Sequence, residues 1–154
     1  MANPIEVNIS GLDQIQKRLE ELRGPLARKA MRAGLKAGAA PVLSAIVQEA
    51  PKDSGFMAEH FNVKYSTKQE GTIGKAFIGP EGKMFYPGEH ARTVRIGGKT
   101  FKAKHLAVAT VVRFHEFGTR FMAANPFMSG AFKAKQQAAL DAIIAALKKN
   151  LGLS

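Results

Sequence analysis

Apolar residues recur every three or four positions in three long segments, the spacing that gathers them on one face of an α-helix. The first predicted helix covers residues 11–22, with Ser10 as its N-cap and the Gly-Pro pair at 24–25 as its end. The second covers residues 25–49 and the third covers residues 126–149. The predicted apolar stripe of the third helix consists of Leu140, Ile144, Leu147 and Leu151.

The second predicted helix carries small residues where another backbone could come close. Its strip, spaced by four, consists of Leu26, Ala30, Gly34 and Gly38. A glycine inside a helix costs roughly 1 kcal/mol relative to alanine, so a closely packed partner is the natural compensation. We expect that partner to be the last helix rather than a neighbouring subunit, because this needs no further assumption. Pro41 removes a backbone hydrogen bond and should kink or interrupt the helix.

Between these helices the pattern changes to the alternation of half-buried strands. Residues 60–65 and 71–79 are predicted to pair antiparallel, and the mostly apolar residues 106–112 to form a further, central strand. Residues 5–9 also alternate and predict a strand. The predicted fold class is therefore α+β, with an antiparallel sheet of about four strands packed by the long second helix and the C-terminal helix.

Residues 81–105 are rich in glycine, proline and basic residues. Within them, residues 93–96 and 99–102 flank Gly97 and Gly98, a pair that suits a two-residue hairpin turn. We predict a single domain over residues 1–154, from which this segment extends as a basic arm or hairpin; a mobile loop is the alternative. The candidate residues that face an interface or DNA are Lys83, Phe85, Tyr86, Arg92, Arg95, Lys99, Lys102 and Lys104.

A short connector joins the predicted strand that ends near Phe117 to the last helix. Asn125 suits the N-cap of that helix, and Pro126 suits its first position. We expect Phe117 and Phe127 to be buried at the two ends of the connector, with Gly118 at the turn. The predicted structural residues of this turn are Glu116, Phe117, Gly118, Thr119, Asn125, Pro126 and Phe127.

Glu116 lies beside aromatic residues, where a carboxylate must be exposed, hydrogen-bonded or paired to avoid a large desolvation cost. The favoured hypothesis is that it anchors the turn by accepting backbone N–H groups near Gly118 and Thr119, with Arg113 or Arg120 nearby. The alternative is a salt bridge across a subunit interface. The local role is preferred because buried donors are usually satisfied within their own domain.

The chain has 154 residues, no cysteine and a formal net charge of +11. The excess lies in residues 25–52 and 81–105, at +4 each, and in residues 126–154, at +3. Such a charge suits a polyanion such as DNA, but equally a solvated face, and the sequence leaves both open. No leader is recognisable and no apolar run is long enough for a membrane span, so no membrane association is expected.

Side chains that could support catalysis or metal binding do not form a recognisable site. Three of the four histidines adjoin a glutamate, but neighbours in a strand point to opposite faces. Zinc-binding histidine spacing and the phosphate-loop motif do not occur. We therefore expect no catalytic residue, no metal site and no cofactor, and we expect that the protein is not an enzyme.

Several short motifs together resemble the minor tail-component, or neck, family of long-tailed bacteriophages. They are Glu116-Phe117-Gly118-Thr119, then Asn125-Pro126-Phe127-Met128, the upstream segment 50–56, and the opening segment 9–13. Together these motifs span most of the chain, from about residue 9 to residue 147. The clearest departure is the segment 80–105, which is longer and more basic than the family pattern.

The resemblance implies a virion structural protein of the head–tail junction, made in the host cytoplasm. It would form a homo-oligomeric ring, sixfold by the symmetry of phage tails, around the DNA path. Its implied partners are further copies of itself, the neighbouring connector, head-closure and tail-tube proteins, and DNA in the lumen, contacted non-specifically. The resemblance does not distinguish between the roles of neck ring, tail terminator and tail-completion protein. The competing hypothesis is a small basic DNA-binding protein, whose affinity should fall steeply with salt.

Overall fold

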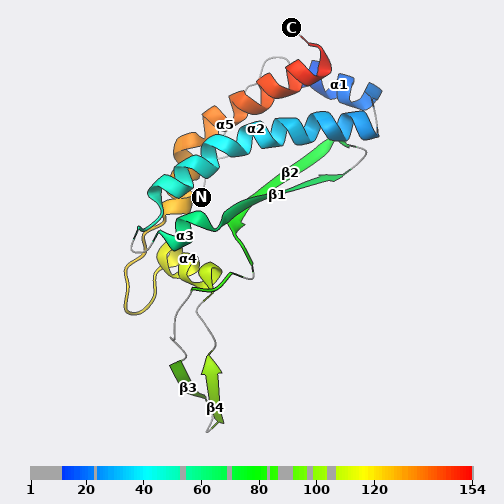
Figure 1. Cartoon of the computed structure of the whole chain (residues 1–154). Helices are drawn as coiled ribbons and strands as arrows, with labels where there is room; N and C mark the ends of the chain where they lie inside the picture. Colours follow the sequence, from blue (N-terminus) through cyan, green and yellow to red (C-terminus); the bar gives the residue numbers. More distant parts are fainter. Residues whose placement is uncertain are drawn as a thin grey trace. The chain divides into compact units, whose positions relative to one another are not determined.

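The computed structural model describes residues 12–22, 24–52, 55–68, 71–82, 84–86, 92–96, 99–103 and 107–153 (Figure 1). It is a mixed helix and sheet structure with two long helices. In chain order the elements are α1 (Leu12–Leu22), α2 (Pro25–Glu49), α3 (Phe56–Glu59), β1 (Phe61–Lys68), β2 (Ile73–Pro80), β3 (Arg92–Ile96), β4 (Lys99–Ala103), α4 (Val108–Phe117) and α5 (Phe127–Leu151). The strand predicted at residues 5–9 and its neighbour Ser10 lie outside the described residues.

The predicted single sheet of about four strands is wrong for the described part of the chain. The strands form two separate two-stranded sheets, β1 with β2 and β3 with β4. Only four residues join β1 to β2, and a connection this short permits only an antiparallel pair. β3 and β4 are antiparallel, so the pairing predicted for residues 93–96 and 99–102 is confirmed.

The segment predicted as a central strand is instead the helix α4. Its β-branched residues favour a strand locally, but strand propensity depends strongly on the packing surroundings. Val108, Val112 and Glu116 are buried at intervals of four, which is the helical period. Burying one helical face therefore outweighed the local preference.

The helix α2 continues through Pro41, so the interruption predicted as one outcome at this residue did not occur, and the kink predicted as the other stays a prediction (Figure 1). Among the described helices, α2 is the one whose length and composition would also suit a membrane span. Half of the most apolar stretch of α2 is buried within the protein, and core helices of soluble proteins can have the same length and composition. Its apolar residues contribute to the two cores described next.

The chain divides into two compact units, each with its own core. The first consists of Met1–Gly38, Tyr65–Ala76 and Leu140–Ser154, and the second of Ala39–Lys64 and Phe77–Ala139. The helices α2 and α5 contribute one part to each unit. The two cores share no residue, and each draws side chains from α2 and α5.

In the first unit, α1, α2 and α5 pack around a core of alanine, leucine, isoleucine and methionine side chains. The buried members are Ile15, Leu19, Ala27, Ala30, Met31, Leu35, Leu147 and Leu151. A Cβ on Gly34 would lie 2.9 Å from Cγ of Leu147, so this glycine allows α5 to approach closely. The predicted packing of the glycine strip on the last helix is confirmed at Gly34. Leu26, predicted in the same strip, is instead 62% exposed.

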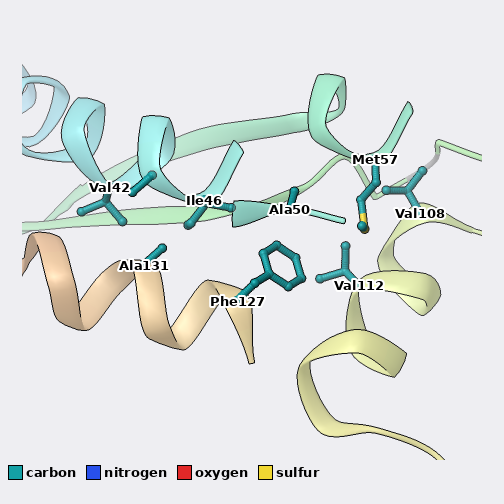
Figure 2. Packing of buried hydrophobic residues seen from close by; sticks show 9 residues of the cluster. Val42, Ile46, Ala50, Met57, Val108, Val112, Phe127 and Ala131 are labelled. Atoms are coloured by element: carbon teal, nitrogen blue, oxygen red, sulfur yellow. The ribbon is translucent and has the colours of Figure 1, made fainter. Parts of the chain in front are cut away.

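The core of the second unit is organised around Phe127, the first residue of α5. Figure 2 shows its ring lying between Ile46 and Ala50 on one side and Val112 of α4 on the other. Its ring also meets that of Phe61 on β1 edge to face, with centroids 6.2 Å apart. Phe127 is 5% exposed, so its predicted burial is confirmed.

Candidate interaction surface

Glu116 is a buried carboxylate on α4 that binds the first turn of α5. Its Oε2 accepts a hydrogen bond from the backbone N–H of Met128 at 3.0 Å. Its Oε1 accepts one from the backbone N–H of Ser129, also at 3.0 Å, and a further one from the Ser129 hydroxyl. The carboxylate thus satisfies free helix N–H groups and places negative charge at the positive end of the helix dipole.

This geometry corrects two details of the predicted turn. The donors to Glu116 belong to Met128 and Ser129, not to the neighbourhood of Gly118 and Thr119. The helix α5 begins at Phe127 rather than Pro126, and the N–H groups expected to bond to the side chain of Asn125 bond to Glu116 instead. Asn125 contributes through its backbone, whose N–H donates to the carbonyl of His115 at 2.7 Å.

The turn after α4 is closed by its own backbone. Gly118 has φ 73° and ψ 177°, a region that is essentially restricted to glycine. A Cβ at this position would lie 2.9 Å from both the carbonyl oxygen of Met122 and the backbone nitrogen of Ala124. Thr119 and Met122 exchange backbone hydrogen bonds of 2.8 and 3.2 Å. The side chains of residues 119–122 are therefore carried by a fixed turn.

Phe117 is 76% exposed, so the prediction that it packs in the core is wrong. It lies on the face of α4 opposite to Val108 and Val112, whose burial leaves the positions of Phe114 and Phe117 outside. Phe121 in the following turn is 83% exposed. We name as the aromatic turn surface the exposed side chains of Phe114, Phe117, Phe121 and Met122.

Basic side chains accompany this surface. The guanidinium of Arg120 lies 4.4 Å from the centre of the Phe121 ring, a cation–π arrangement. Between residues 107 and 140, Glu116 is the only acidic residue, and its carboxylate is buried. The arginines and lysines of the same stretch are all exposed: Arg113, Arg120, Lys133 and Lys135. The outside of this stretch is therefore aromatic and cationic.

The base of the predicted basic arm is joined to the second unit. Phe85 and Ala107 form an antiparallel bridge, and the N–H of Val108 donates to the carbonyl of Met84 at 3.0 Å. Tyr86 is half-buried against the core, with its ring 5.0 Å from that of Phe56. Phe85 is 48% exposed and stays a candidate contact. Tyr86 is better described as a core residue.

The remaining candidate residues of the arm are placed only by their backbones. Lys83 and Lys104 lie outside the described residues. Arg92, Arg95, Lys99 and Lys102 lie on β3 and β4, where Arg92 pairs with Ala103 and Ile96 with Lys99. Their role toward DNA or protein stays a prediction.

Sequence reasoning identified Glu116 and Gly118 but missed the exposed aromatic surface. The spacing of three between Phe114 and Phe117, with Val108 and Val112 on the opposite face, was the available signal once a helix is assumed. Within the described part of the chain, no group of three or more His, Cys, Asp or Glu could hold a metal ion.

Residues 13–118 match the HK97-gp10-like family, described as "Bacteriophage HK97-gp10, putative tail-component". The match covers more than half of the 154 residues, and the chain belongs to this family. The resemblance seen in the sequence motifs is thereby confirmed, and the family is one of structural components of the bacteriophage tail. Comparisons with curated proteins and with solved structures find no match.

Proposed function

We propose that this tail component acts at the head–tail junction, as a neck or tail-completion protein that forms a homo-oligomeric ring around the DNA path. The observation that carries the proposal is the family match over residues 13–118. The ring would stand between the head connector and the tail tube, with those proteins as its axial neighbours. A structural role of this kind requires no catalytic site.

The net charge of +11 supports a position beside DNA. Cations on a ring lumen attract phosphates without reading sequence, so DNA could pass while the protein stays bound to its protein neighbours. The basic residues of the arm, Arg92, Arg95, Lys99 and Lys102, are the candidates for this contact or for an axial protein contact.

The deciding experiment deletes the gene for this chain from the phage and examines the resulting particles by electron microscopy. We expect filled heads and complete tails that remain unjoined, and we expect the purified protein, alone or mixed with connector and tail-tube proteins, to form rings. Normal infectious particles without the chain would refute the proposal.

The alternative, a small basic DNA-binding protein, is favoured by the same net charge and gives a different result on duplex DNA. It would be retained at moderate salt and would lose affinity steeply as salt rises, because each phosphate contact releases counterions. A neck component should be weakly retained at moderate salt. Measuring DNA retention over a salt series, beside the sizing of the free protein, separates the two functions.

A further inference from the structure

We propose that the aromatic turn surface docks a different protein, one whose contact face is apolar and bordered by carboxylates. This inference rests on the burial and charge of the surface itself and assigns a partner that the ring proposal does not specify. The surface-forming side chains are Phe114, Phe117, Phe121 and Met122, with exposed fractions of 40%, 76%, 83% and 37%. Grouped large apolar side chains on a protein surface mark interaction sites.

The grouping follows from the local backbone. Phe114 and Phe117 are three residues apart on α4 and therefore lie side by side on its outer face. Phe121 and Met122 follow in the turn after α4. The carbonyl oxygen of Met122 lies 2.9 Å from the position that a Cβ on Gly118 would take. The four side chains therefore come from one short, continuous segment of the second unit.

Several hydrogen bonds join this segment to the rest of the second unit and close its turn. Glu116 binds it to α5, the Asn125 N–H binds the carbonyl of His115, and Thr119 and Met122 close the turn between them. The N–H of Phe121 also donates to the Thr119 hydroxyl at 3.2 Å. A surface that is already ordered loses little conformational entropy on binding, so its apolar area is used efficiently.

Charge decides the kind of partner. Arg113 and Arg120 are exposed within this surface segment, and the single carboxylate of the stretch, Glu116, is buried and already hydrogen-bonded. A partner with carboxylates around an apolar centre would complement this potential and would be selected by it. Phenylalanine and arginine in the same contact match the composition of protein interfaces, which are enriched in aromatic residues and arginine.

Two other occupants fit less well. In a two-fold contact between two copies, the same cationic patch would face itself, and in the head-to-tail contact of a ring it would face another surface of a chain that carries +11 as a whole. Duplex DNA presents sugar and phosphate on its outside, which would engage the arginines but leave the phenylalanine rings uncovered. Both occupants are therefore outcomes that would overturn the proposal.

The test is photo-crosslinking in cells that produce the phage, with p-benzoylphenylalanine replacing Phe117 or, in a second variant, Phe121. Phe77 on β2 is the matched control, because it is also a phenylalanine of the second unit and is 59% exposed. We expect positions 117 and 121 to crosslink to one protein other than this chain, at a peptide that contains acidic residues. Position 77 should not crosslink to that protein.

A charge-reversed variant tests the acidic border. Arg113→Glu combined with Arg120→Glu should reduce the crosslink from position 117 at least about tenfold, since like charges across a contact oppose association. Circular dichroism checks that this variant remains folded. An undiminished crosslink would overturn the stated chemistry. Crosslinks to a second copy or to DNA, equal crosslinking from position 77, or no crosslink at all would overturn the docking surface.

The outcome is separable from that of the proposed function. If the chain is absent from purified particles but positions 117 and 121 still capture an acidic protein in the cell, the neck proposal fails and the docking surface stands. If the chain joins head to tail but these positions capture only copies of itself, the docking proposal fails and the neck role stands.

Discussion

Replacing Glu116 by alanine removes the contact that ties α4 to the start of α5. The two backbone N–H groups of Met128 and Ser129 and the Ser129 hydroxyl would lose their acceptor. Loss of an N-capping acceptor costs about 1 kcal/mol and up to about 2, and loss of the favourable charge at the helix N-terminus adds about 0.3–1. With the unfilled space left in a site that is only 9% exposed, we expect a total of about 2–4 kcal/mol.

For a protein of 154 residues, each kcal/mol lowers the melting temperature by roughly 2–4 °C, so the expected fall is about 4–16 °C. Glu116→Gln should cost less, about 1–2 kcal/mol, because the amide keeps one acceptor oxygen but turns a donor toward the helix N–H groups. The matched control is Glu49→Gln, at an exposed position of α2, which should change stability by less than about 0.5 kcal/mol.

Thermal unfolding followed by circular dichroism measures these differences, and hydrogen exchange locates them. The amides of Met128 and Ser129 should lose protection in Glu116→Ala while those in the middle of α1 keep it. Sizing of the same samples addresses the other hypothesis for this residue. If the Glu116→Ala protein keeps its melting temperature but changes its oligomeric state, the capping role is refuted and an intersubunit salt bridge is favoured.

Two further predictions concern the same region, and a third concerns the basic arm. Gly118→Ala should destabilise by at least about 2 kcal/mol, because it combines a glycine-only backbone conformation with backbone contacts at 2.9 Å; Gly130→Ala, in open space on α5, should instead stabilise by up to about 1 kcal/mol. Phe127→Ala should cost about 3–5 kcal/mol, whereas Phe117→Ala should cost less than about 0.5, and equal melting temperatures for both would contradict the assigned burial. Replacing residues 88–105 by a Gly-Ser linker should preserve cooperative thermal unfolding but impair assembly, and a variant that fails to fold would show that this segment belongs to a core.

The last deletion is shorter than the 81–105 arm defined from sequence, and the structure gives the reason. Met84 and Tyr86 pack against the core of the second unit, and Phe85 bridges Ala107. A deletion that began before these residues would remove core side chains along with the arm. Its failure would then say nothing about the arm itself.

The long helices and the hairpins could be predicted from the sequence. Their predicted limits agree with α1, α2 and α5 to within two residues at each end, because periodic apolar residues and Gly-Pro punctuation are local signals. The same holds for β3 and β4, where a Gly-Gly pair between alternating segments predicts a tight turn. The burial of Phe127 also followed, since it opens an amphipathic helix.

Tertiary structure alone decided α4 and everything that it positions. Val108 to Phe117 contains β-branched and aromatic residues that suit a strand, and only the availability of a core for Val108, Val112 and Glu116 selects the helix. That choice places Phe117 outside. It also carries the Glu116 carboxylate to donors that lie twelve and thirteen residues further along the chain. Contacts of this kind depend on how separate helices meet, which no local pattern of residues specifies.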